Sequence, residues 1–246
     1  MDTGIKGKSV LITEAVGNYG RATVMAFAEE GANLLLTTFS SQSQLEEVAH
    51  QASTLGVRVE TRLSYARDEA GAQALAQQGI AEFGHLDILV NNVVYPLSTE
   101  SLEKISFKEW KRKIEVEVTG SFFICRAVLP GMIQQQWGRV ISYTGLAAFL
   151  GTEAPSSATE YGIVGLTRGI AREYGKYNIT ANCIGPGGVE AGDDLGFIPS
   201  TPSDSDPIPR WGKPEEVTFL TIWLASEGAG YVTGQSLLVN GGKQFL

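Results

Sequence analysis

The stretch "SVLITEAVGNYGRATVMAFAEEG", residues 9–31, decides the fold class. It opens with an apolar run that suits a buried strand and continues into a helical segment. The same order of strand and helix recurs along the chain, with further strand-like runs at 33–38, 57–63, 86–92, 138–144, 179–185 and 235–241. Regular alternation of this kind gives a parallel sheet with helices on both faces and right-handed crossovers. We therefore predict an α/β fold, a single doubly wound parallel sheet, as one domain over residues 1–246.

The charge and composition of the chain exclude several classes of partner. The 246 residues carry a formal net charge of −8, whereas nucleic acids and anionic membrane surfaces attract basic patches. The N-terminal sequence has no basic stretch followed by an apolar core. No apolar run approaches the roughly 18 residues needed to span a bilayer. We expect a cytoplasmic protein that binds neither nucleic acid nor membrane.

The two cysteines and two histidines give no sign of a metal site. Cys125 and Cys183 lie alone in apolar segments, and neither has a partner at metal-ligand spacing. His50 and His85 are likewise separated from other ligand residues. We expect two buried, reduced thiols and no bound metal.

One long segment breaks the alternation of strands and helices. Residues 187–211 hold four aspartates and four prolines without any periodicity. A loop of this length in a compact domain is usually functional or disordered. We predict a flexible lid over a site, with a mobile surface loop as the alternative.

Several segments together resemble one known family. They are "RWGKPEEVTFLTIWLASEGAGYVTGQSLLVNGG" (210–242), "GHLDILVNN" (84–92) and "GIVGLTRGIAREYGKYNITANCIGPG" (162–187). They resemble short-chain dehydrogenases/reductases over essentially the whole chain, nearest to the 3-oxoacyl-acyl-carrier-protein reductase type. The resemblance implies a Rossmann-like fold, a small-molecule substrate, and a homodimer or homotetramer packed through the C-terminal segment.

The resemblance also implies where a dinucleotide cofactor would lie. Its pyrophosphate would rest on a glycine turn and a helix N-terminus, here "TEAVGNYG", residues 13–20. The segment that contains Asn91 and Asn92 would pass the adenosine, and the Pro186–Gly187 turn would face the nicotinamide. The positions that would bind the cofactor are Thr13, Gly17, Gly20, Asn91, Pro186 and Gly187.

Substitutions in these segments argue against a cofactor. Glu14 and Asn18 replace two glycines of the turn, although backbone must approach the pyrophosphate there without a Cβ in the way. Residues 37–41, after the second strand, contain no acidic residue for a ribose hydroxyl. The sequence therefore favours no cofactor, and if one binds, NADP(H) over NAD(H).

The family's four catalytic positions are all substituted as well. The resemblance places Ser156 at the catalytic tyrosine, Glu160 at the lysine and Gly145 at the serine. Glu117 stands at the position of the helper asparagine. A carboxylate at position 160 reverses the charge that normally lowers the pKa of the tyrosine.

These substitutions suggest a different chemistry, built on a pair of carboxylates. Glu117 and Glu160 would share one partly desolvated site, which splits their pKa values and suits proton transfer. The side chains of Ser142, Tyr143 and Ser156 would hold a substrate oxygen. We predict a non-redox enzyme of isomerase or lyase type. The alternatives are an NADP(H)-dependent oxidoreductase working with substituted residues, and a non-catalytic scaffold or partner subunit.

Overall fold

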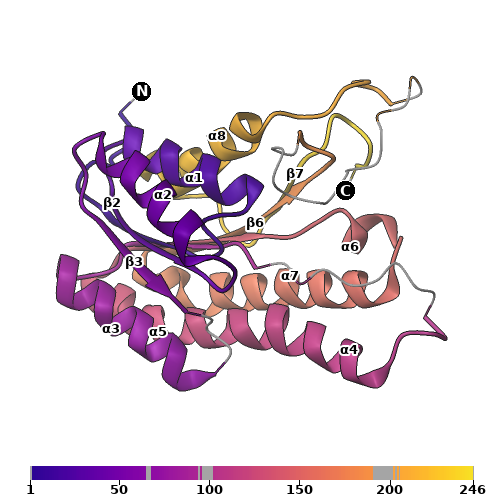
Figure 1. Ribbon diagram of the computed structural model, residues 1–246, viewed down its shortest axis with the longest axis horizontal. Helices are drawn as coiled ribbons and strands as arrows, with labels where there is room; N and C mark the ends of the chain where they lie inside the picture. The colour runs from indigo at the N-terminus through magenta and orange to yellow at the C-terminus, as the bar shows by residue number, and fades with distance from the viewer. Residues whose placement is uncertain are drawn as a thin grey trace.

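A single parallel sheet organises the molecule. The structure is a computed structural model that describes residues 2–64, 68–93, 95, 102–190, 202, 204 and 206–245. Within these residues, seven strands follow the order β3-β2-β1-β4-β5-β6-β7, and each neighbouring pair is parallel (Figure 1). The strands are β1 (Ser9–Ile12), β2 (Asn33–Thr38), β3 (Val59–Leu63), β4 (Ile88–Asn91), β5 (Gly138–Tyr143), β6 (Ile179–Pro186) and β7 (Ser236–Val239). The predicted doubly wound α/β fold is confirmed.

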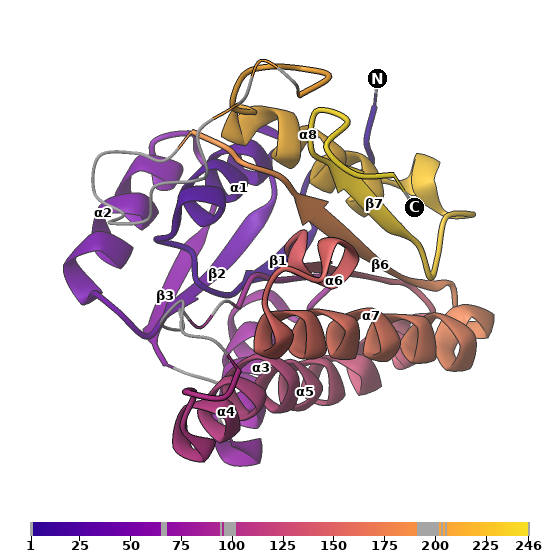
Figure 2. The ribbon, with the colours of Figure 1, turned by 90° about the vertical axis from the view of Figure 1, so that its right-hand side faces the viewer.

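Helices cover both faces of the sheet, as Figures 1 and 2 show. One face carries α1 (Asn18–Glu29), α2 (Gln42–Ser53) and α8 (Pro214–Ala225). The other carries α3 (Glu69–Phe83), α5 (Gly120–Gln135) and α7 (Ala154–Tyr174). The short elements are α6 (Ala147–Leu150), η2 (Gly175–Tyr177) and η3 (Glu227–Ala229). Two large apolar clusters fill the space between helices and sheet, one on each face, because the buried strands present apolar side chains to both.

Local signals set the ends of several helices. The Ser41 hydroxyl accepts a hydrogen bond from the Gln44 backbone N–H at the start of α2, and Asp68 caps α3 in the same way at Gly71. Helix α3 ends at Gly84, whose φ of 86° lies in the left-handed region that glycine tolerates.

The long helical stretch Phe107–Gln135 contains an irregular segment. Ser106 and Glu109 form a capping box at the start of α4 (Phe107–Lys113). Residues Ile114–Thr119 then form a π-helix, η1, which continues into α5. Wider π turns inside helices occur frequently at functional sites. This turn carries Glu117.

The same helix bears on the expectation about membranes. By length and composition, the helical stretch Phe107–Gln135 could cross a bilayer, so the expectation that no apolar run approaches that length is wrong. Half of its most apolar window is nevertheless buried inside the molecule, where α5 packs between α3 and α7. A core helix of a globular domain passes the same test, so the finding is weak evidence for a membrane span.

The strand order fixes where a ligand would bind. Along the sheet, β1 and β4 are neighbours, and the chain runs from β1 to β2 on one side and from β4 to β5 on the other. In open parallel sheets, ligands bind outside the carboxyl ends of the strands at such a reversal. The turn 13–20 and Asn91 lie at these ends. Of the predicted lid, 187–211, residues 191–201, 203 and 205 lie outside the described part of the chain, so the lid stays a prediction.

Candidate functional site

The turn after β1 is tightly packed and leads into the N-terminus of a helix. Gly17 is the N-cap residue of α1 and, having no side chain, provides no side-chain cap. A Cβ on Gly20 would lie 2.2 Å from the Glu14 carbonyl oxygen, so this position accepts glycine alone. Thr13 anchors the turn to β4, because its hydroxyl accepts a 2.9 Å hydrogen bond from the Asn92 backbone N–H. An uncapped helix N-terminus behind a tight turn is suited to an anion.

Glu14 has a backbone conformation that usually favours glycine. Its φ is 51°, in the left-handed region. Its side chain reaches the end of β2, where one carboxylate oxygen accepts a 3.1 Å hydrogen bond from the Thr38 hydroxyl. The other accepts a 3.2 Å hydrogen bond from the Phe39 backbone N–H. Burial raises the pKa of Glu14 to about 7, and these two hydrogen bonds oppose the shift.

We expect Glu14 to make stability depend on pH. Its pKa rises from 4.5 to about 7 on folding, so between these values the native state holds more protons than the unfolded state. The contribution of Glu14 to the free energy of unfolding therefore falls as the pH rises from about 4.5 to 7. Replacing Glu14 by Gln removes this loss. Relative to wild type, the free energy of unfolding of the variant should therefore rise by up to about 3 kcal/mol between pH 4.5 and 8. Urea unfolding across that range measures the gain, and parallel stability curves for the two proteins would contradict it.

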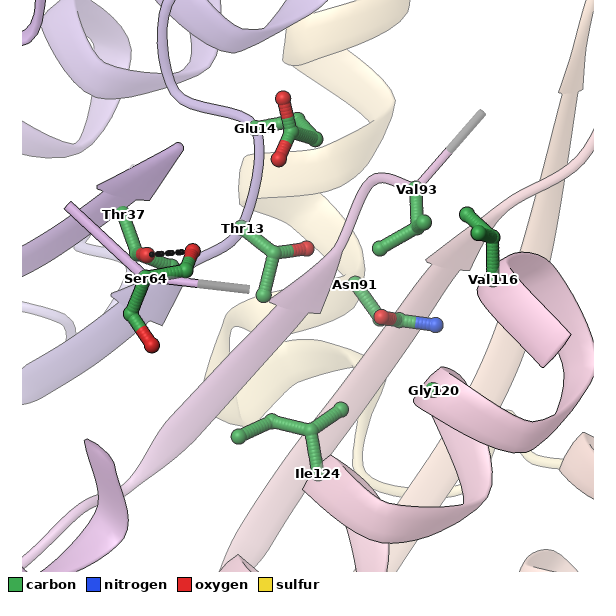
Figure 3. Close-up of a pocket in the computed structure, with 9 residues that line it drawn as sticks. All are labelled: Thr13, Glu14, Thr37, Ser64, Asn91, Val93, Val116, Gly120 and Ile124. Atoms are coloured by element: carbon green, nitrogen blue, oxygen red, sulfur yellow. Dashed lines mark hydrogen bonds between the residues drawn. The ribbon is translucent and has the colours of Figure 1, made fainter. Parts of the chain in front are cut away.

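A small pocket opens between the ends of β1, β2 and β4 and the start of α5 (Figure 3). Thr13, Glu14, Asn91 and Val93 are among its lining residues. Of the residues that the structure describes, Asn91 alone leaves a buried side-chain oxygen, Oδ1, without a hydrogen-bond partner. An unpaired buried acceptor costs about 1–3 kcal/mol. A ligand that donates a hydrogen bond in this pocket would remove that cost.

The Pro-Gly turn at the end of β6 closes the other side of the site. Gly187 passes so close to β7 that a Cβ on it would lie 2.8 Å from the Cα atom of Asn240. The Tyr19 hydroxyl, from the first turn of α1, donates a 3.3 Å hydrogen bond to the Gly187 carbonyl oxygen. The turn after β1 and the Pro186–Gly187 turn are thereby joined. No pattern in the sequence indicates a role for Tyr19.

Glu117 is paired with a lysine that sequence reasoning missed. Its carboxylate lies 2.8 Å from the Lys113 Nζ atom, and both side chains are about 95% buried, at 5% and 6% exposed. The Tyr95 backbone N–H donates to the same carboxylate oxygen at 2.7 Å, and Lys113 donates to the Tyr95 carbonyl oxygen at 3.0 Å. The basic residues at 108–113 suggest a solvated helix face from their sequence, but Lys113 is buried.

Glu160 occupies the space beside Gly145. A Cβ on Gly145 would lie 2.5 Å from Oε1 of Glu160, and the other carboxylate oxygen accepts a 2.8 Å hydrogen bond from the Ala148 backbone N–H. The pKa of Glu160 is raised, chiefly by burial and also by the charge of Glu117, while Lys113 and hydrogen bonds lower it. The two glutamates therefore influence each other, but each has other partners, and Glu117 is held by the lysine.

The two serines of the predicted site lie on the same side of the sheet as these groups. Ser156 is buried in the first turn of α7, and its hydroxyl donates a 3.0 Å hydrogen bond to Glu153. Ser142 is buried near the carboxyl end of β5, two residues after Val140 and therefore on the same face of the sheet. Val140 packs against the helices of that face, α5 among them.

Tyr143 does not belong to the site. Its hydroxyl lies between helices on the opposite face, 2.9 Å from the Thr23 hydroxyl on α1 and 2.7 Å from the Thr221 hydroxyl on α8. Successive residues of a strand point to opposite faces, so Ser142 and Tyr143 cannot serve one substrate oxygen together. The prediction of Tyr143 as a substrate-binding residue is wrong.

Comparisons with known proteins identify the family. The family model described as enoyl-(acyl carrier protein) reductase matches residues 17–244. The 3-oxoacyl-[acyl-carrier-protein] reductase FabG of Thermotoga maritima is 29% identical, over 97% of this chain and 98% of its own. Among solved structures, acetoin dehydrogenase YohF of Salmonella typhimurium superposes with a TM-score of 0.85 at 31% identity, covering 96% of each chain. NAD⁺-bound xylitol dehydrogenase gives a TM-score of 0.89 at 26% identity, over 97% of this chain and 99% of its own.

These findings overturn the preferred hypothesis from the sequence. The relatives are reductases and dehydrogenases, so the non-redox isomerase or lyase built on Glu117 and Glu160 is contradicted, and nothing supports a silent scaffold. The family uses nicotinamide dinucleotides, and one structural neighbour holds NAD⁺, so the expectation of no cofactor is not supported either. The chain belongs to the short-chain dehydrogenase/reductase family and is of the 3-oxoacyl-acyl-carrier-protein reductase type.

Proposed function

We propose that this protein is an oxidoreductase that uses a nicotinamide dinucleotide to interconvert a carbonyl group and an alcohol on a small molecule. The observation that carries the proposal is the turn after β1. Its helix begins after Gly17 without a side-chain cap, and Gly20 still lets the helix pack closely on the turn, despite the substitutions at Glu14 and Asn18.

The residues around this turn fit a dinucleotide. The backbone N–H groups at the start of α1 would hold the pyrophosphate. The unpaired Oδ1 of Asn91 would accept a hydrogen bond from the bound molecule, and Pro186 and Gly187 would flank its nicotinamide end. When bound, the nicotinamide ring supplies or accepts the hydride.

The proton that accompanies the hydride needs a carrier on the protein. The raised pKa of Glu160 keeps its carboxyl group protonated to higher pH than an ordinary glutamate. Glu160 lies one helical turn after Ser156 on α7. The Ser156 hydroxyl would form a hydrogen bond with the substrate oxygen. We propose Glu160 as the group that gives this proton to the oxygen on reduction and takes it back on oxidation. The Lys113–Glu117 pair would set the charge beside it.

The proposal is tested by following absorbance at 340 nm with NADH or NADPH and a panel of small ketones and 3-oxo esters. We expect turnover with at least one carbonyl compound, and we expect Glu160→Gln to slow it roughly 10²–10⁴-fold, as loss of an acid/base group does. The exposed Glu173, near the other end of α7, provides the matched control, and Glu173→Gln should keep the wild-type rate.

Two results would count against these statements separately. No oxidation of either reduced dinucleotide with any compound of the panel would contradict the oxidoreductase. Full activity of Glu160→Gln would leave the oxidoreductase standing and remove Glu160 from its mechanism. The predictions of a homodimer or homotetramer and of a cytoplasmic location are untested and stay predictions.

A further inference from the structure

We propose that Glu14 selects the cofactor: its carboxylate binds the adenosine ribose 2′-hydroxyl of NAD(H) and excludes the 2′-phosphate of NADP(H). The inference rests on the proposed function, since it assumes that a dinucleotide binds across the turn after β1. It assigns to a residue of the turn itself a task that doubly wound folds usually give to an acidic residue about 20 positions further on.

The position of the carboxylate carries the argument. Although Glu14 follows β1 in the sequence, both of its carboxylate oxygens are held at the end of β2, by the Thr38 hydroxyl and the Phe39 backbone N–H. The end of the second strand is where an adenosine ribose meets its acidic partner. The chain thus has a carboxylate at this place although residues 37–41 contain none.

The carboxylate is also able to bind a further partner. An ionised carboxylate has about four acceptor positions, and the two hydrogen bonds from Thr38 and Phe39 use one on each oxygen. Glu14 is only partly buried and lines the pocket between the ends of β1, β2 and β4, where Figure 3 shows it above Thr13. Its two fixed hydrogen bonds orient the remaining acceptor positions before any sugar arrives, which limits the entropy lost on binding.

The surrounding charges exclude a 2′-phosphate. No Lys or Arg occurs between Ala32 and Val57, a stretch that includes the end of β2 and all of α2. Arg21, in the first turn of α1, is engaged by the Val16 carbonyl oxygen at 3.2 Å and faces Glu47 at 3.7 Å. Among the residues that the structure describes, a 2′-phosphate would therefore meet a carboxylate without a compensating cation. The sequence-based preference for NADP(H) came from the lack of an acidic residue after β2, and the position of Glu14 removes that reason.

The test is the affinity of the purified protein for NAD⁺, NADP⁺, ADP-ribose and 2′-phospho-ADP-ribose, measured by isothermal titration calorimetry. The pH is set well above the value of about 7 to which the pKa of Glu14 is raised, so that its carboxyl group is ionised. We expect wild type to bind NAD⁺ on the order of 100-fold more tightly than NADP⁺, because like charges in contact are strongly unfavourable. The two ADP-ribose compounds should show the same ratio, since they lack nicotinamide and differ only at the 2′ position.

Two substitutions at position 14 test the assignment. Glu14→Gln keeps the size of the side chain and removes its charge, and Glu14→Gly suits the positive φ and removes the side chain altogether. In both variants the ratio should fall below roughly tenfold, chiefly through tighter binding of NADP⁺. Glu46→Gln is the matched control, because it removes an exposed carboxylate from the neighbouring helix α2 and should leave the ratio unchanged.

Each outcome decides one way. Equal affinity of wild type for NAD⁺ and NADP⁺, or an unchanged ratio in both position-14 variants, would overturn the role of Glu14 and leave the proposed oxidoreductase intact. Failure of all four compounds to bind would overturn the inference together with the proposed function.

Discussion

Replacing Lys113 by methionine is expected to lower the free energy of unfolding by about 3–5 kcal/mol, because the change leaves Glu117 as a buried charge without its partner. The two groups are 2.8 Å apart, and neither side chain is more than 6% exposed. For a domain of this size the loss corresponds to a fall of roughly 6–20 °C in melting temperature. Urea unfolding with and without the substitution measures it.

A pair on another face of the same helical stretch provides a matched control. Lys111 and Glu115 have the same spacing as Lys113 and Glu117, but their side chains are exposed and 3.5 Å apart. Lys111→Met should therefore cost less than about 1 kcal/mol. The double variant Lys113→Met with Glu117→Gln should recover part of the loss, since no charge then stays buried. Equal costs for the two lysine substitutions would contradict the buried pair.

Replacing Gly20 by alanine is the second large effect. The new Cβ would meet main-chain atoms, 2.2 Å from the Glu14 carbonyl oxygen and 2.7 Å from the Ala15 carbonyl carbon. Main-chain atoms cannot move to relieve this contact as a flexible side chain can. We therefore expect the free energy of unfolding to fall by at least about 1–3 kcal/mol, the usual cost of overpacking. The displaced turn should also lose its affinity for any dinucleotide. Thermal unfolding and calorimetric titration with NAD⁺ measure the two effects.

Gly17 serves as the control for this substitution. It precedes the same helix at a φ of −65°, which any residue adopts, and a Cβ on it would have its nearest contact at 3.6 Å, an ordinary separation. Gly17→Ala should leave stability within about 0.5 kcal/mol of wild type. If Gly20→Ala were equally harmless, the close approach at the turn would not be a requirement of the fold.

The sequence predicted the sheet well because the strands are buried on both faces. The runs at 9–13, 33–38 and 138–144 are continuous and apolar, and each became a strand within one residue of its expected limits. By contrast, nothing in the sequence of the helical stretch 107–135 marks the π turn at Ile114–Thr119. A π turn depends on how the helix packs, which local propensity does not encode.

Two errors in the site could have been avoided from spacing alone. Ser142 and Tyr143 are adjacent in a strand, so only one of them could face the substrate. Lys113 lies four residues before Glu117, a spacing at which side chains on a helix meet and opposite charges pair. Its burial, however, depends on packing against neighbouring elements and could not be predicted from the helix itself.

The behaviour of Glu14 was beyond the reach of sequence reasoning. A residue other than glycine rarely takes a φ of 51°, and a carboxylate there was expected to obstruct phosphate binding. In the structure the side chain turns to the end of β2 instead, where it finds two hydrogen-bond donors. Which way a side chain leaves a tight turn depends on donors brought near by tertiary structure, and these come from a strand more than 20 positions away.

The central claim, that this chain binds a nicotinamide dinucleotide at the turn 13–20, is tested most directly by the melting temperature of the purified protein with NAD⁺, NADH, NADP⁺ or NADPH. A ligand at 100 times its Kd stabilises a protein by about 2.7 kcal/mol, which for this size raises the midpoint by roughly 5–11 °C. We predict such a rise with NAD⁺ or NADH, and its loss in Gly20→Ala. No rise with any of the four at millimolar concentration would contradict the account.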